Sequence, residues 1–207
     1  MAGNRGYNSL GSKSRLRLIE AASELLADQG YQVVSARRIA DKAGLKPQLV
    51  HYYFRSMEEL VVAVYQRSSA NYFRLHDQAL SSPHPLRALW ELNTNMPEVR
   101  RMTEYVALGK LYPALRAEML RTGDNYRQLQ IEAIEQVYTA RGITNPCITP
   151  ETLAMLMSAL ARNFLIEAEV GLSLGHAGAR ALVEDILDRL DPLEAETEGA
   201  GMASPKD

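Results

Sequence analysis

Residues 35–54 read SARRIADKAGLKPQLVHYYF and determine the fold expected for the N-terminal part of the chain. Ser35 is a typical N-cap residue, and the apolar residues after it recur at the spacing of a short helix over 36–43. Gly44 permits a tight turn, and Pro47 suits the first turn of a second helix that ends near Tyr53. The segment therefore predicts a helix-turn-helix, two short helices that meet at a tight turn.

The second of these helices has one apolar face and one polar face. Val50 and Phe54 are four residues apart, so they share a face that packs on the first helix. The residues left on the outward face are Lys46, Pro47, Gln48, His51 and Tyr52. Cation, amide, imidazole and phenol groups contact base edges and phosphates in a major groove. A helical hairpin that only packs is the alternative, and the polarity of this face disfavours it.

Helical patterns continue on both sides of the segment. Ser56 and Glu59 form a capping box that opens a helix towards Leu80. The other predicted helices cover 14–29, 86–95, 97–111, 113–141 with an interruption near Gly123, 151–172 and 177–190. No segment alternates with a period of two, so the predicted class is all-α, with about nine helices. The polar, Gly- and Ser-rich ends, 1–13 and 193–207, are expected to be a disordered arm and tail.

The charge of the chain differs between its two parts. The net charge is −2, yet residues 1–67 contain 10 Lys and Arg against 6 Asp and Glu, giving +4. The remainder, with 13 basic and 19 acidic residues, carries −6. A basic N-terminal part followed by an acidic remainder is typical of a protein that binds nucleic-acid phosphates with one end only.

Composition argues against several other classes of protein. The single cysteine, Cys147, excludes an intrachain disulfide, and the four histidines lack the spacing of a metal-binding helix. We therefore expect no metal and no cofactor. No apolar stretch approaches the roughly 20 residues of a membrane-spanning helix, and no signal peptide is apparent at the start. The expected location is the cytoplasm.

Residues 14–60 closely resemble the DNA-binding domain of the TetR family of bacterial regulators. The resemblance is carried by Ala21-Ala22 before Gly30, by Ile39-Ala40, Ala43-Gly44-Leu45, Val50 and Tyr52-Tyr53-Phe54, and by Ser56 with Glu58-Glu59-Leu60. It implies an all-helical fold in which residues 14–56 form a three-helix DNA-binding domain and residues 57–192 form a helical sensor and dimerisation domain.

The resemblance also implies which residues contact DNA. These are Ser35 and Arg37 from the first helix of the motif, and Lys46, Gln48, His51 and Tyr52 from the second. Arg37 suits a guanine as a two-pronged donor, and Gln48 suits adenine or a phosphate. Three positions depart from the family pattern: Leu49 replaces a frequent Thr, His51 a frequent Tyr and Met57 a frequent Lys.

The body is rich in aromatic residues and Met, which in this family often line a ligand cavity. The candidate ligand-binding residues are Trp90, Met102, Tyr105, Tyr126 and Asn163. Arg162, which interrupts the same apolar helix as Asn163, is a further candidate. Ordinary core packing is the alternative for the apolar members of this set.

The last two predicted helices carry broad apolar stripes. One stripe contains Leu153, Leu156, Leu160, Phe164 and Leu172, and the other contains Leu182, Val183, Ile186, Leu187 and Leu190. Such width indicates burial both in the subunit and across a homodimer, where the two pairs would form a four-helix bundle. The alternative is that both stripes are buried only within the core of a monomer.

These features predict a transcriptional regulator and not an enzyme. The expected mechanism is a repressor that a small-molecule effector releases from a palindromic double-stranded DNA operator. The alternatives are a helical small-molecule-binding protein or enzyme with a degenerate helix-turn-helix, and a regulator that responds to a protein partner. No nucleophile elbow or phosphate-binding Gly loop supports an enzyme.

Overall fold

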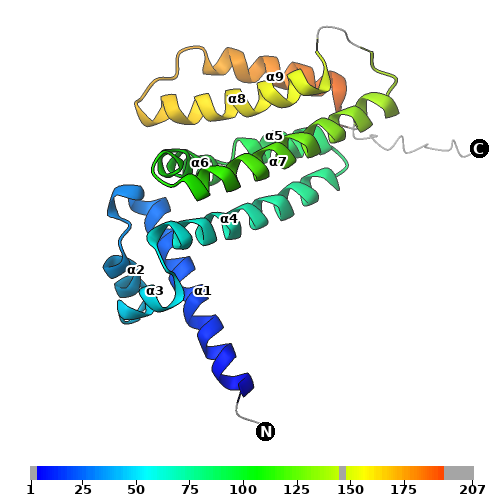
Figure 1. Ribbon diagram of the computed structural model, residues 1–207. Coiled ribbons are helices and arrows are strands. Elements are labelled where there is room, and N and C mark those ends of the chain that lie inside the picture. Colours follow the sequence, from blue (N-terminus) through cyan, green and yellow to red (C-terminus); the bar gives the residue numbers. More distant parts are fainter. Residues whose placement is uncertain (1–3, 145–147, 194–207) are drawn as a thin grey trace, which may run out of the picture.

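The computed structural model describes residues 4–144 and 148–193, and over these residues the chain is all-helical, as the sequence predicts. The α-helices of this part of the chain are α1 (Asn4–Gln29), α2 (Ala36–Ala43), α3 (Gln48–Tyr53), α4 (Met57–Leu80), α5 (Pro85–Asn93), α6 (Met96–Gly109), α7 (Pro113–Ala140), α8 (Pro150–Glu169) and α9 (His176–Leu190). Figure 1 shows α1, α2 and α3 as a head at one end of the molecule, with α8 and α9 on the far side of the body from α4.

Local capping sets the boundaries of the head helices. The Ser35 hydroxyl accepts a hydrogen bond from the Arg38 N–H at 3.4 Å, and Gly44 ends α2 in the left-handed conformation, with φ of 63°. At the start of α4 the Ser56 hydroxyl accepts from the Glu59 N–H at 3.1 Å. These caps satisfy N–H groups that a helix start leaves without partners, so the boundaries follow from residues close in sequence.

Two apolar cores hold the molecule together. The first joins the head to the start of α4 and includes Leu18, Ile39, Val50, Phe54 and Leu60. Its other members include Tyr65 on α4, Tyr105 and Leu108 on α6 and Leu115 on α7. The second core lies among α5, α7, α8 and α9 and includes Trp90 and Phe164. Because α4 packs into the head, the predicted boundary between residues 56 and 57 marks a capping box and not a gap in packing.

Two predicted features of the helices are wrong. Helix α1 begins at Asn4, so residues 4–13 of the predicted disordered arm are helical; extending an existing helix avoids the cost of nucleating a new one. Helix α7 runs without a break through Gly123. Its neighbour Thr122 is hydrogen-bonded to Tyr65 of α4, and packing of this kind outweighs the roughly 1 kcal/mol that Gly costs inside a helix. Cys147 and residues 194–207 of the predicted tail lie outside the described residues.

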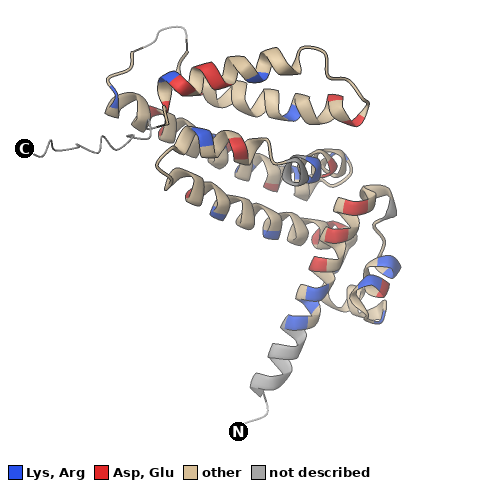
Figure 2. Cartoon of the chain, turned by 180° about the vertical axis from the view of Figure 1, so that it is seen from behind, with Lys and Arg blue, Asp and Glu red and all other residues tan. Residues whose placement is uncertain are grey.

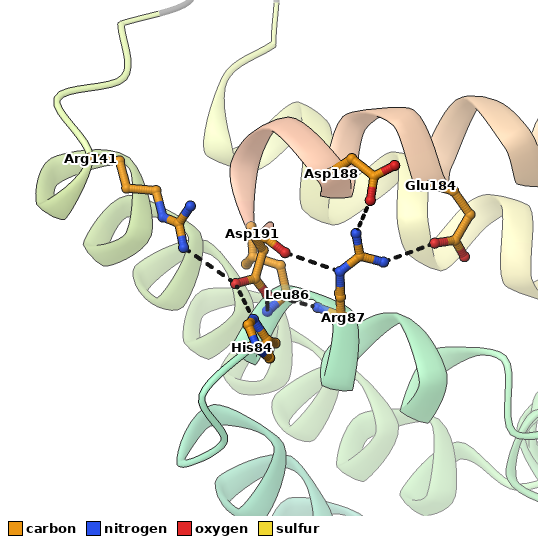
Figure 3. A network of polar contacts seen from close by, with 7 residues as sticks. All are labelled: His84, Leu86, Arg87, Arg141, Glu184, Asp188 and Asp191. Carbon is orange, nitrogen blue, oxygen red and sulfur yellow. Dashed lines mark hydrogen bonds and ion pairs between the residues drawn. The ribbon is translucent and has the colours of Figure 1, made fainter. Parts of the chain in front are cut away.

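A buried carboxylate ties the end of α9 to the start of α5 (Figure 3). Asp191, 1% exposed, accepts hydrogen bonds from the backbone N–H groups of Leu86 at 2.9 Å and Arg87 at 3.2 Å. It also lies 3.5 Å from His84 Nδ1 and 3.7 Å from Arg141 Nη2. Asp191 thus caps α5 from a distant point in the chain, and we call this cluster the Asp191 clasp. It fixes the start of α5, the helix whose last residue, Asn93, lines the cavity described below.

Candidate nucleic-acid interface and body cavity

The structure places the predicted contact residues of α3 on one side of a firmly packed helix. Val50 is 2% exposed in the head core, as is Phe54 just after the helix, at 1%. Gln48, His51 and Tyr52 are exposed, Tyr52 by 70%. Lys46 is exposed in the turn before the helix. The backbone of α3 is therefore held by the core while its outward side chains are exposed, which suits a helix that enters a DNA groove.

The two predicted contact residues near the start of α2 differ in their surroundings. The Ser35 hydroxyl caps the helix, so it already has a hydrogen-bond donor. Arg37 is exposed, and within the described part of the chain its guanidinium has no hydrogen bond or ion pair. Its neighbours are engaged: Arg38 donates to Gln29 Oε1 at 2.6 Å, and Lys42 pairs with Glu24 at 3.0 Å. Arg37 is thus available to an anion or a base in a way that Arg38 and Lys42 are not.

The basic residues of α1 support the head from within. The Arg15 guanidinium lies 4.9 Å from the centre of the Phe54 ring, and Arg17 donates to the carbonyl of Ala43 at the end of α2. Figure 2 shows Lys and Arg on the middle part of α1 and on the α2–α3 pair, with acidic residues on the part of α1 nearer the body.

Two side-chain contacts connect the head to the body, and a third joins the start of α4 to α7. Glu104 on α6 accepts a hydrogen bond from the Tyr31 N–H at 2.8 Å, at the start of a 3₁₀ turn over Tyr31–Val33 that the sequence did not predict. Glu58 accepts from the Ala114 N–H at 2.7 Å, which links the start of α4 to α7. Arg67 on α4 pairs with Glu20 on α1 at 2.6 Å. The Glu104 hydrogen bond thus links α6 directly to the segment between α1 and α2.

The body contains a cavity of about 220 Å³. A single water needs only about 10–15 Å³ on this measure, so the space is sufficient for a small organic molecule. Helices α4, α5, α6, α7 and α8 all contribute to its wall. Of the predicted ligand-binding residues, Met102, Tyr105 and Tyr126 line it, as does Arg162.

Trp90 and Asn163 lie outside this cavity. Trp90 is 5% exposed in the second core, where its ring packs edge-on to Phe164 at 6.2 Å. Asn163 is exposed on α8 near Glu167. The hydrogen bond with His176 is the main cause that lowers the pKa of the Glu167 carboxyl group, and Asn163 adds to the effect. A large aromatic residue and a polar residue in an apolar helix each fit several environments, and only the packing of the helices decides between them.

A polar network crosses one wall of the cavity. Asn93 Oδ1 accepts from the hydroxyl of Tyr126 at 3.1 Å and from that of Tyr72 at 3.3 Å. Gln130 Nε2 donates to the Tyr126 oxygen at 2.9 Å, and the Ser158 hydroxyl donates to Gln130 Oε1 at 3.4 Å. Sequence reasoning missed Asn93 and Gln130. Both are amides inside otherwise amphipathic helices, and the signal, a polar residue on a buried face, becomes visible only once those faces are known.

Comparison with known proteins agrees with this arrangement. The family profile described as "Bacterial regulatory proteins, tetR family" matches residues 18–64. The HTH-type transcriptional activator FasR of Mycolicibacterium smegmatis is 40% identical over 70 residues, which are 33% of this chain and 32% of that protein. The HTH-type transcriptional regulator BetI of Rhizobium meliloti is 43% identical over 49 residues, 24% of each chain.

Solved structures extend the likeness to the body. A putative transcriptional regulator from Saccharomonospora viridis in complex with choline superposes with a TM-score of 0.73 at 22% identity, over 86% of this chain and 96% of that one. A TetR transcription regulator from Haloarcula marismortui superposes with a TM-score of 0.68 at 15% identity, over 87% and 99% of the two chains. Residues 18–64 of this chain thus match the TetR family of bacterial regulators, and the whole chain shares its fold with the solved structures.

The sequence match to the TetR family lies in the head and the start of α4, whereas the body shares only its fold with the solved structures. The matched segments span about a third or less of the length of the two curated relatives. None of the helices that the structure describes is long and apolar enough to cross a membrane. The same residues contain no group of three or more His, Cys, Asp or Glu side chains arranged to hold a metal ion.

Proposed function

We propose that this TetR-family protein is a sequence-specific, DNA-binding transcriptional regulator that acts as a homodimeric repressor and is released from its operator by a small molecule. The observation that carries the proposal is the face of α3: Gln48, His51 and Tyr52 are exposed, while Val50 and Phe54 anchor the backbone behind them. With Arg37 and Lys46 this face combines base-reading and phosphate-binding groups.

The proposed dimer forms through α8 and α9. On α8, Met155, Ile166 and Val170 are 56%, 52% and 72% exposed, and on α9 Leu182 is 54% exposed. Residues 155 and 166 are eleven apart, so they lie on the same face of the helix, opposite its buried face. Exposed apolar side chains on the last two helices favour a symmetric interface, which would place two copies of α3 in successive major grooves about 34–36 Å apart.

The proposed release depends on α6, which connects the cavity to the head. Met102 and Tyr105 line the cavity, and Glu104 between them accepts the hydrogen bond from the Tyr31 N–H. An effector that binds better to one position of α6 would favour one separation of the two heads. A coupling free energy of about 1–3 kcal/mol between effector and operator is typical of such systems.

Selection of bound sequences from random DNA tests this function. The proposal predicts an enriched palindrome whose half-sites are about 10 base pairs apart, with an affinity that falls steeply with salt. A reporter gene behind the selected site then gives the sign of regulation, and loss of expression supports repression. Since the M. smegmatis relative is named an activator, increased expression would overturn the repressor part alone. No enriched sequence at all would overturn the function.

A further inference from the structure

The charged side chains among the described lining residues of the cavity are all arginines. Arg101, Arg127 and Arg162 line the cavity, and no Asp or Glu is among the described residues of its lining. The Arg127 Nη1 atom is buried and has no hydrogen-bond partner in the described part of the chain. Arg127 is half-buried, so the cavity contains a cation with one nitrogen removed from water and no hydrogen-bond partner for it among the described residues, which is costly.

Arg127 and Arg162 are close enough to repel each other. Burial lowers the pKa of Arg127, and the neighbouring positive charge of Arg162 lowers it further. Arg127 comes from α7 and Arg162 from α8, so two separate helices bring like charges to the same space. Proteins use this arrangement where an oxyanion is to be bound, because an arginine pair is relieved of its repulsion when a shared carboxylate or phosphate arrives.

A neutral donor lies in the same cavity. Asn93 is 6% exposed, and its oxygen accepts from Tyr72 and Tyr126. Its amide nitrogen is buried and has no acceptor among the described residues. Burial raises the pKa of Tyr126, so no phenolate there offsets the arginines at neutral pH. Asn93 therefore offers a hydrogen-bond donor to a ligand acceptor.

The remainder of the wall is apolar. Phe73, Met102 and Met119 line it together with the rings of Tyr65 and Tyr105, which pack edge to face at 5.0 Å. Flat aromatic and adaptable Met surfaces bind an apolar body, and the small volume limits its size.

We propose that the cavity binds a small amphipathic anion, whose carboxylate or phosphate group lies on Arg127 and Arg162 and whose apolar body lies against the aromatic and Met side chains. This inference rests on the proposed function, because it names the chemical class of the effector.

A charge-matched set of probes tests it on the full chain. The probes are 4-phenylbutyrate, 4-phenylbutanol and 4-phenylbutylamine, with phenyl phosphate as the phosphate arm, and the readout is the shift of Tm together with calorimetric titration. The proposal predicts binding of 4-phenylbutyrate or phenyl phosphate at least tenfold tighter than of the alcohol, and no binding of the amine. The better of the two anions identifies the head group. Binding of the amine or alcohol as tight as of the anions would overturn the proposal, as would binding of neither anion.

Variants tie the preference to the two arginines. The double variant Arg127→Gln/Arg162→Gln should lose the preference for the anion and have a Tm at least equal to that of the wild type without ligand, since the repulsion is gone. Arg116→Gln, an exposed arginine of α7 outside the cavity lining, should keep the preference. If the double variant fails to fold, the single variant Arg162→Gln, at an exposed position, gives the same test. An unchanged preference in a folded variant would contradict the proposal.

DNA binding measured in parallel separates this inference from the proposed function. If the selected operator is bound but the anion preference is absent, only the effector class is wrong. If no DNA is bound specifically, the regulatory function fails, and the Tm shifts still report whether the cavity selects anions.

Discussion

Replacing Asp191 by Ala removes the carboxylate of the Asp191 clasp and tests how the body is held together. The backbone N–H groups of Leu86 and Arg87 lose their acceptor, and the Arg141 guanidinium loses the ion pair with a carboxylate that is 1% exposed. Breaking a buried charged group away from its partners costs about 3–5 kcal/mol. For a chain of this size that corresponds to a fall in Tm of roughly 6–20 °C.

Two further variants sharpen this prediction. Asp191→Asn keeps an acceptor for the backbone N–H groups but loses the charge, so it should cost about half as much. Asp185→Ala is the matched control on the same helix, because its ion pair with Arg189 is solvent-exposed and should contribute less than about 1 kcal/mol. The measurement is urea unfolding followed by circular dichroism at one fixed protein concentration. If Asp191→Ala unfolds within about 1 kcal/mol of the wild type, the clasp does not carry the stability assigned to it.

Three further changes test other parts of the molecule. Lys46→Ala should weaken binding to all DNA sequences alike and reduce the slope of log affinity against log salt by about 1, while Arg116→Ala leaves the slope unchanged. Ile166→Asp should convert a dimer to monomers in sedimentation equilibrium, and Leu120→Asp, an equally exposed site on α7, should not; a dimer in both would place the interface elsewhere. Burial lowers the pKa of His76 in the folded state, so the unfolded chain binds a proton at His76 at a higher pH than the folded chain does. The free energy of unfolding should therefore decrease below about pH 6.5, by up to about 1.4 kcal/mol per pH unit. His76→Leu should reduce this slope by the same amount.

The parts of the fold that depend on neighbouring residues were predictable from the sequence. Ser35, Gly44 and Ser56 set helix boundaries through hydrogen bonds or φ values within a few positions, and the structure has these caps where the sequence predicts them. The inward face of the helix-turn-helix was predictable for the same reason, since Val50 and Phe54 follow from helical spacing alone.

The parts that depend on packing between distant helices were not. Gly123 suggested a break, yet α7 continues because its neighbours are held against α4. Trp90 and Met102 were equally plausible as cavity residues, and only the crossing of five helices puts Met102 in the wall and Trp90 in the second core. Arg127 carried no local signal, because a single arginine in an amphipathic helix reads as solvent-exposed until a second helix brings Arg162 beside it.

The most direct test of the central claim is the affinity of the Arg37→Ala variant for the selected operator, compared with a scrambled duplex at the same salt concentration. If Arg37 contacts a base as a two-pronged donor, the affinity for the operator should fall about 5- to 150-fold, equivalent to 1–3 kcal/mol, and the base preference at one position of each half-site should relax. Gln48→Ala should relax a different position, and Arg116→Ala should change neither. Wild-type affinity and specificity in the Arg37→Ala variant would contradict the assignment of this face to DNA.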